Sequence, residues 1–234
     1  MLSTFIIALR EGLEACLIVG ILVAYIVKTN RQGYLKPLWT GVITAVIASI
    51  ALGAFLTLTS VSLSDRGQEL FAGVTSFIAV ALVTWMVFWM KRTARTLRGE
   101  LQGKLDNAVA TGPLALAGVA FIAVIREGLE TSLFVYTNFQ TVADVTSSTI
   151  GLLLGFAVSI TLGYLIYKSA IRLNLAKFFT YSGVALIIVA AGVLSYGVHE
   201  FQELGYLPGP DAFAWDVTSI IAKDSIMGAS LSGT

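Results

Sequence analysis

Six long apolar stretches limit what this chain can fold into. They cover residues 3–27, 38–60, 70–90, 113–138, 149–168 and 180–199. Each is close to the roughly 20 residues that a helix needs to cross the hydrocarbon core of a bilayer. Only 12% of the 234 residues are charged, about half the fraction typical of soluble domains. We therefore expect an all-α polytopic protein of the plasma membrane with no soluble domain.

The first stretch does not resemble a cleaved signal peptide. It has no basic segment at its start, and Arg10 interrupts what would be the apolar core of such a peptide. We interpret residues 1–27 as a retained membrane helix.

The connections between the stretches differ in charge, and this difference predicts the orientation. Eleven of the fifteen cations lie in three alternate connections: Lys28, Arg31, Lys36, Lys91, Arg92, Arg95, Arg98, Lys104, Lys168, Arg172 and Lys177. The other side carries only Arg66 and Lys223, together with eight acids: Asp65, Glu69, Asp144, Glu200, Glu203, Asp211, Asp216 and Asp224. Because Lys and Arg accumulate in cytoplasmic loops, we expect the N-terminus and the acidic face outside.

Residues 91–112 separate the third and fourth stretches. Leu97, Leu101 and Leu105 recur every four residues there, a spacing that predicts an amphipathic cytoplasmic helix at the membrane interface. Trp39, Trp85 and Trp89 fall at the inner ends of the second and third stretches, where we expect them to anchor these helices at the interface.

The two halves of the chain resemble each other. FIIALREGLE at 5–14 matches FIAVIREGLE at 121–130, an offset of 116. The second and fifth stretches match at an offset of 110, which pairs Gly41, Ser49, Ile50, Leu52 and Gly53 with Gly151, Ser159, Ile160, Leu162 and Gly163. The third and sixth stretches share that offset through Gly73-Val74 and Gly183-Val184.

Three spans in each half make the halves inverted repeats, since an odd number reverses the direction of the second copy. We expect repeat one at 1–90, repeat two at 113–200 and an outer C-terminal segment at 201–234. Transporters with this architecture bind their substrate near the membrane midplane, between the repeats.

The REGLE motif places three charges in each of two apolar stretches. Positions i, i+3 and i+4 share one face of a helix, so the charges of each copy form one patch: Arg10, Glu11 and Glu14, and Arg126, Glu127 and Glu130. Six such charges facing lipid would cost on the order of 15–20 kcal/mol. We therefore expect the patches to face each other, with the small Gly12 and Gly128 letting the two helices approach closely.

The combined patch has four carboxylates and two guanidinium groups, a formal charge of −2. An anionic site rich in oxygen suits a hard cation: Fe³⁺, with Fe²⁺ and Mn²⁺ as alternatives. The four glutamates are the predicted metal ligands, and Arg10 and Arg126 the counter-ions. A salt-bridge network without a ligand and a proton relay are the other interpretations.

A second group of polar residues lies on the predicted outer face. Asp65 and Glu69 precede the third stretch, and His199, Glu200 and Glu203 end the sixth. We interpret them as a vestibule that concentrates cations, and an ordinary solvated helix end fits them equally well.

The doubled R-E-x-x-E motif resembles that of the oxidase-dependent iron permeases. ELFAGV and TWMVFWM in the third stretch, and IRLNLAKFF before the sixth, are similar to the bacterial EfeU-like branch in particular. The resemblance implies a permease rather than an enzyme. It also implies iron as substrate, no prosthetic group, iron translocation by Glu11, Glu14, Glu127 and Glu130, and extracytoplasmic iron-oxidising and iron-binding partner proteins.

The chain departs from that family at one point. Members typically have a seventh span, whereas residues 201–234 contain no apolar run of 20 residues. Phe213, Val217, Ile220 and Ile221 predict an amphipathic helix at the outer surface instead. A manganese or proton-coupled cation transporter and a membrane di-iron oxidase are the alternative functions.

Overall fold

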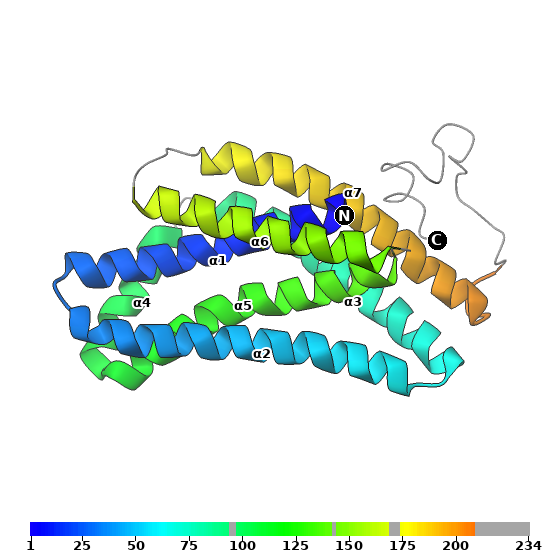
Figure 1. Ribbon diagram of the computed structural model, residues 1–234, viewed down its shortest axis with the longest axis horizontal. Helices are drawn as coiled ribbons and strands as arrows, with labels where there is room; N and C mark the ends of the chain where they lie inside the picture. Colours follow the sequence, from blue (N-terminus) through cyan, green and yellow to red (C-terminus); the bar gives the residue numbers. More distant parts are fainter. Residues whose placement is uncertain (94–96, 142–143, 169–173, 209–234) are drawn as a thin grey trace.

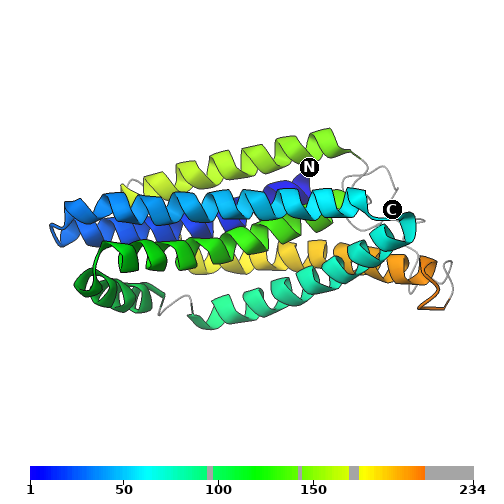
Figure 2. The same cartoon turned by 90° about the horizontal axis from the view of Figure 1, so that it is seen from below.

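The computed structural model describes residues 1–93, 97–141, 144–168 and 174–208, and over these ranges the chain is helical. Most of the helices run along one long axis (Figures 1 and 2). The elements are α1 (Leu2–Lys28), η1 (Gln32–Tyr34), α2 (Leu35–Ser62), α3 (Asp65–Thr93), α4 (Leu97–Thr111), α5 (Pro113–Gln140), α6 (Val145–Tyr167) and α7 (Leu175–Glu203). The predicted all-α architecture is confirmed.

Local signals explain where several helices begin. Gly112, with a φ of 133°, and Pro113 start α5, because proline fits the first helical turn. The Asp144 side chain accepts hydrogen bonds from the backbone N–H groups of Thr146 and Ser147 at the start of α6. The Asn174 side chain caps α7 in the same way through Lys177. α6 and α7 begin before the predicted apolar stretches at 149 and 180, whereas α5 begins at the predicted residue 113.

Length and apolar character mark the described part of the chain as a multi-pass membrane protein. Four helical segments, Gln32–Ser62, Asp65–Trp89, Val145–Tyr167 and Leu175–Glu203, are long and apolar enough to cross a bilayer. α1 and α5, with 27 and 28 residues, are also long enough but each contains the three REGLE charges. Large apolar side chains face outward, among them Ile50 and Ile160, which are 69% and 60% exposed. This surface suits lipid rather than water.

The connections between helices separate into two ends of the bundle. The α1–α2 turn, α4 and the start of α7 lie at one end, which we call the basic end because Lys28, Arg31, Lys104 and Lys177 belong to it (Figure 1). The opposite end, the acidic end, holds the N-terminus, the α2–α3 and α5–α6 connections and the end of α7 (Figures 1 and 2).

Two pairs of parallel helices pack through small residues. α6 lies along α1, and α2 lies along α5 (Figure 1). A methyl group added at Gly41 would lie 2.2 Å from the Ala117 carbonyl oxygen, and one at Gly151 would lie 2.3 Å from that of Met1. Such close approach of backbones needs glycine at these positions.

The contacts of the two pairs correspond through the offsets of the sequence repeat. Gly12 of α1 packs on Ser159 of α6, and Gly128 of α5 packs on Ser49 of α2. Further along, Gly163 meets Cys16 and Gly53 meets Ser132. Each of these contacts in one helix pair corresponds to a contact in the other pair, with residue numbers that differ by 116 for α1 and α5 and by 110 for α2 and α6.

The prediction that Gly12 and Gly128 let the two REGLE helices approach each other is wrong. The side of each glycine that lacks a side chain packs against a serine of α6 or α2 rather than against the opposite REGLE helix. In each motif the glycine packs against a neighbouring helix, whereas the glutamates face the other REGLE copy.

α3 and α7 pack along a further side of the bundle, and α4 covers part of the basic end (Figure 2). Leu101 and Leu105 of α4, 6% and 0% exposed, belong to the same apolar cluster as Leu22 of α1 and Leu116 of α5. The apolar face predicted for this segment thus packs against the bundle. The predicted surface helix around Phe213–Ile221 lies outside the described residues.

Candidate metal site

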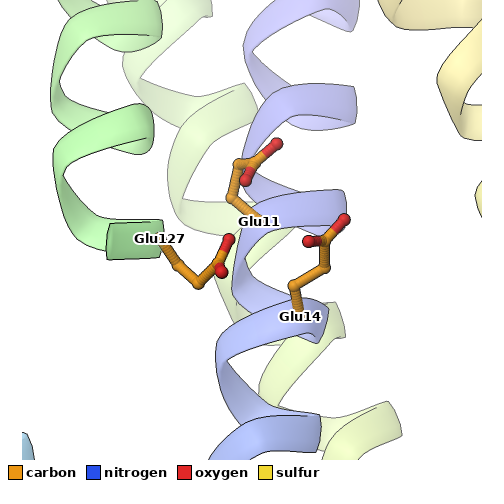
Figure 3. A group of neighbouring side chains, drawn as sticks. All are labelled: Glu11, Glu14 and Glu127. Atoms are coloured by element: carbon orange, nitrogen blue, oxygen red, sulfur yellow. The ribbon is translucent and has the colours of Figure 1, made fainter. Parts of the chain in front are cut away.

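Three buried carboxylates from two helices come together in the middle of the bundle. Glu11 and Glu14 of α1 and Glu127 of α5 each offer one oxygen, and these atoms lie within 4.8 Å of one another (Figure 3). The three residues are 0%, 5% and 4% exposed. Within the described ranges, this is the one group of three carboxylate, His or Cys side chains gathered so tightly.

Helix geometry accounts for the arrangement. The i, i+3 spacing of Glu11 and Glu14 places both on one side of α1, and Glu127 reaches toward them from α5 (Figure 3). Glu130, one turn after Glu127, is also buried, and its Oε1 lies 3.2 Å from Nε of Arg126. We refer to the four glutamates as the carboxylate cluster.

Arg10 is enclosed by the cluster. Its Nη1 lies 3.3 Å from Oε1 of Glu11 and its Nη2 lies 3.2 Å from Oε1 of Glu14. The arginine is only 1% exposed. Both ion pairs are formed within α1, so the first REGLE copy neutralises part of its own charge.

Arg126 has different surroundings, although its motif is identical. Its side chain is 37% exposed, and its guanidinium carbon lies 3.9 Å from the centre of the Trp89 ring of α3. Trp89 thus contacts a charged group of the site, in addition to its expected place near the end of the span.

Several carboxylate oxygens of the cluster lack partners. Oε2 of Glu11, of Glu127 and of Glu130 is buried and accepts no hydrogen bond from the residues that the structure describes. A buried acceptor left without a partner costs about 1–3 kcal/mol, and more when it is charged. A salt-bridge network without a ligand would not need to leave these oxygens free, whereas a bound cation would use them.

A cavity of about 790 Å³ connects the cluster to the basic end. Glu14, Glu127 and Arg126 line its deep part, and Lys28 and Lys104 line the part near the basic end. Most of the remaining wall is apolar and comes from several helices, including Cys16 of α1 and Phe179 of α7.

Apolar side chains lie on the side of the carboxylate cluster that faces the acidic end. They form an apolar cluster contributed by α1, α3, α5 and α7, which includes Ile7, Val83, Phe134 and Leu186. The cavity between these helices measures only about 10 Å³, too little for more than about one water molecule.

The five predicted vestibule residues lie at the acidic end but do not form a compact metal-binding group. Nε2 of His199 lies 3.2 Å from Oε1 of Glu203, and Glu200 is buried while Asp65 is exposed. α3 and α7 meet nearby, where the Phe77 and Phe201 rings are 5.5 Å apart. Within the described ranges, these five side chains do not gather as closely as Glu11, Glu14 and Glu127.

Sequence reasoning missed Trp89 as a residue of the site. It is 37 positions before Arg126, and its place near a span end has a sufficient explanation in interface anchoring. The TWMVFWM segment, which contains Trp89, is notable for its similarity to the iron permeases. No spacing rule relates this segment to the REGLE motif of α5.

Comparisons with known proteins find iron permeases among the relatives of this chain. The ferrous iron permease EfeU of Yersinia pestis is 35% identical over 236 residues, which cover all of this chain and 83% of the relative. The ferrous iron permease EfeU of Escherichia coli O6:H1 is 36% identical over all of this chain and 85% of the relative. No solved structure matches the chain. Residues 1–233 match the iron permease FTR1 family, and the chain belongs to that family.

Proposed function

We propose that this chain carries ferrous iron across the plasma membrane through the carboxylate cluster. The observation that carries the proposal is the meeting of Glu11, Glu14 and Glu127 within 4.8 Å, all buried and from helices of both sequence halves. Like charges this close in a membrane interior repel one another. A bound cation removes the repulsion and supplies the partner that the free oxygens lack.

Charge balance favours a divalent ion. Four carboxylates and two guanidinium groups sum to −2, so Fe²⁺ brings the site to neutrality, whereas Fe³⁺ leaves a charge of +1. An uncompensated charge away from water is expensive. The names of the relatives from Yersinia pestis and Escherichia coli also specify ferrous iron.

The proposed layout is a pair of inverted repeats, 1–90 and 113–200, with the N-terminus outside. It is supported by the packing contacts that the offsets of 110 and 116 relate to one another, and by the collection of basic connections at one end of the bundle. The axis relating the halves would pass close to the carboxylate cluster, as in other transporters with a midplane site.

The proposed path begins at the acidic end. Asp65, Glu69, Glu200 and Glu203 attract cations there, and partner proteins that bind iron would act on that side. The cluster then coordinates the ion, and the 790 Å³ cavity provides release toward the basic end. Since apolar side chains close the opposite side, loading requires one repeat to move relative to the other.

A manganese transporter is the second candidate, because a site made of carboxylates also suits Mn²⁺. Excess Mn²⁺ should compete poorly with iron if iron is the substrate. A di-iron oxidase lacks support, since such centres pair Glu-x-x-His motifs. The only histidine of the chain, His199, lies at the acidic end and pairs with Glu203.

The test is uptake of radioactive iron in cells that lack their own iron permeases. Glu11→Gln, Glu14→Gln and Glu127→Gln should each lower uptake at least about tenfold, since each removes one charged ligand. Asp144→Asn is the control and should keep most of the uptake, because this exposed side chain caps α6 and asparagine caps a helix about as well as aspartate. Wild-type uptake by all three cluster variants, present in the membrane at normal amounts, would refute the site.

A further inference from the structure

The contact between Arg126 and Trp89 lies where the cavity meets the carboxylate cluster. Both residues line the cavity, as does Glu127. The guanidinium is held from two sides, by Oε1 of Glu130 at 3.2 Å from its Nε and by the Trp89 ring at 3.9 Å from its carbon. Trp is the aromatic residue with the strongest attraction for a cation over its face.

Arg10 shows what the same motif does where no tryptophan of the described residues lies against the arginine. It binds its own i+1 and i+4 glutamates together. Among the described contacts, Arg126 pairs with its i+4 glutamate, Glu130, and not with Glu127 at i+1. Because REGLE is identical in the two copies, the cause of the difference lies in the surroundings of the motif.

The difference decides which carboxylates remain free for a cation. Glu127 reaches the pair Glu11 and Glu14, and its buried Oε2 has no hydrogen-bond partner within the described ranges. If Arg126 paired with Glu127 as Arg10 pairs with Glu11, its positive charge would neutralise the one carboxylate of the three that no ion pair within the described ranges holds. In the structure this charge lies over the Trp89 ring and beside Glu130 instead.

We propose that Trp89 is a positioning residue of the metal site, which holds the Arg126 guanidinium away from Glu127 and so keeps this carboxylate available to a divalent cation. The inference rests on the proposed function of the carboxylate cluster. It gives α3, which contributes no carboxylate to the cluster, a direct influence on metal affinity.

The test measures binding of Fe²⁺ to purified protein under anaerobic conditions. Trp89→Leu should weaken binding about three- to thirtyfold, the range that a cation–π contact can account for. Trp89→Tyr should recover part of the loss, because a tyrosine ring still attracts a cation. Trp85→Leu, one turn earlier on α3 and 70% exposed, should bind like the wild type.

A second pair of variants separates positioning from simple packing. In an Arg126→Gln background no guanidinium remains to be positioned, so adding Trp89→Leu should change Fe²⁺ affinity less than twofold or so. An equal loss in both backgrounds would overturn the inference, and so would wild-type affinity of Trp89→Leu alone.

Glu127→Gln distinguishes failure of the inference about Trp89 from failure of the proposed function. If the wild type binds Fe²⁺ and Glu127→Gln does not, the cluster is the site, and the Trp89 variants then decide the inference alone. If Glu127→Gln binds like the wild type, the proposed site is wrong, and the inference falls with it. Thermal unfolding of each variant confirms that the protein measured is folded.

Discussion

The two REGLE copies have the same sequence but different surroundings. In α1 the arginine is 1% exposed and holds two carboxylates, while in α5 its side chain is 37% exposed and lies against a tryptophan. The glycines of the two motifs, in contrast, make equivalent contacts with Ser159 and Ser49. The packing of the helix pairs follows the repeat, and the environment of the charges does not.

This comparison suggests how one site can serve two sides of a membrane. The exposed arginine lines the cavity toward the basic end, whereas the buried one does not and lies one helical turn from Ile7 of the apolar cluster toward the acidic end. If the repeats are related by a two-fold axis, the opposite state would exchange the two environments. Arg10 would then become the exposed arginine, next to a cavity toward the acidic end.

The largest expected difference between the copies is in stability. Arg10→Gln leaves Glu11 and Glu14 buried without a counter-ion, which should lower the free energy of unfolding by about 3–5 kcal/mol. Arg126→Gln removes a half-exposed partner and should cost about 1 kcal/mol or less. Denaturant unfolding in detergent micelles measures both values.

Added Fe²⁺ sharpens this prediction, because a cation in the cluster would replace part of the missing charge. It should restore more stability to Arg10→Gln than to Arg126→Gln. If the two variants lose the same free energy of unfolding without metal, the unequal burial of the two arginines does not affect stability.

The glycines provide the next test, and here the copies should behave nearly alike. A methyl group at Gly128 would lie 2.7 Å from Cβ of Ser49, and one at Gly12 would lie 3.0 Å from Cβ of Ser159. Overpacking of this kind costs about 1–3 kcal/mol. We expect Gly128→Ala near the upper value and Gly12→Ala near the lower one, measured by the same unfolding experiment.

Two further glycines are matched controls. Gly20 of α1 and Gly118 of α5 have nothing within 4 Å of an added methyl group, so alanine there should keep or slightly raise stability. Ser49→Gly should rescue Gly128→Ala, because it removes the atoms that the new methyl group meets. Failure of this rescue would argue against the packing of α2 on α5.

Much of the architecture could be predicted because a membrane helix is encoded locally. Each apolar stretch coincides with a helix, and only the ends differ: α3 begins at Asp65 rather than 70, α6 ends at Tyr167 rather than 168, and α7 runs from Leu175 to Glu203 rather than 180–199. The hydrocarbon core limits the apolar run, but a helix continues past it wherever its backbone remains hydrogen-bonded.

The candidate site could be predicted only in part. Helical spacing places Glu11 with Glu14, and the repeat indicates Glu127 as a residue from the facing helix. Identical motifs give no indication that Arg10 and Arg126 differ, because that difference depends on Trp89 and on which side of the bundle is open. Long-range contacts and conformational state are not contained in a spacing pattern.

Cysteine accessibility compares the two sides of the site directly. Cys16 is the only cysteine of the chain and lines the cavity toward the basic end. Its counterpart at an offset of 116 is Ser132, whose hydroxyl donates to the Ser49 carbonyl at 2.7 Å between α5 and α2. A membrane-impermeant maleimide should label Cys16 about tenfold faster than Ser132→Cys in a Cys16→Ala background, because enclosed thiols are unreactive.

The side of the membrane from which the maleimide reaches Cys16 also tests the proposed orientation of the protein. Cys16 should react in inside-out vesicles, in which the reagent meets the cytoplasmic face, and much more slowly in right-side-out vesicles. Preferential labelling of Ser132→Cys, or of Cys16 from the outside, would contradict the proposed direction of the cavity.

The smallest expected effect concerns α4, the connection between the halves, which is not repeated. The Tyr25 hydroxyl of α1 donates a hydrogen bond to the Asp106 carboxylate of α4, and Tyr25, Leu101 and Lys104 line the cavity. Tyr25→Phe should lower the free energy of unfolding by about 1 kcal/mol or less, because the bond is exposed to solvent. It should also raise the rate of Cys16 labelling by less than about threefold, since α4 remains packed through Leu101 and Leu105.

Asp106→Asn provides the matched variant, because it weakens the same bond from the other side. If the bond restrains α4 at the basic end, the two changes combined should affect labelling no more than either alone. Additive effects would mean that Tyr25 and Asp106 act separately, and that α4 covers the cavity only through its apolar face. The asymmetry between the two REGLE copies would then depend on Trp89 and the cavity rather than on this connection.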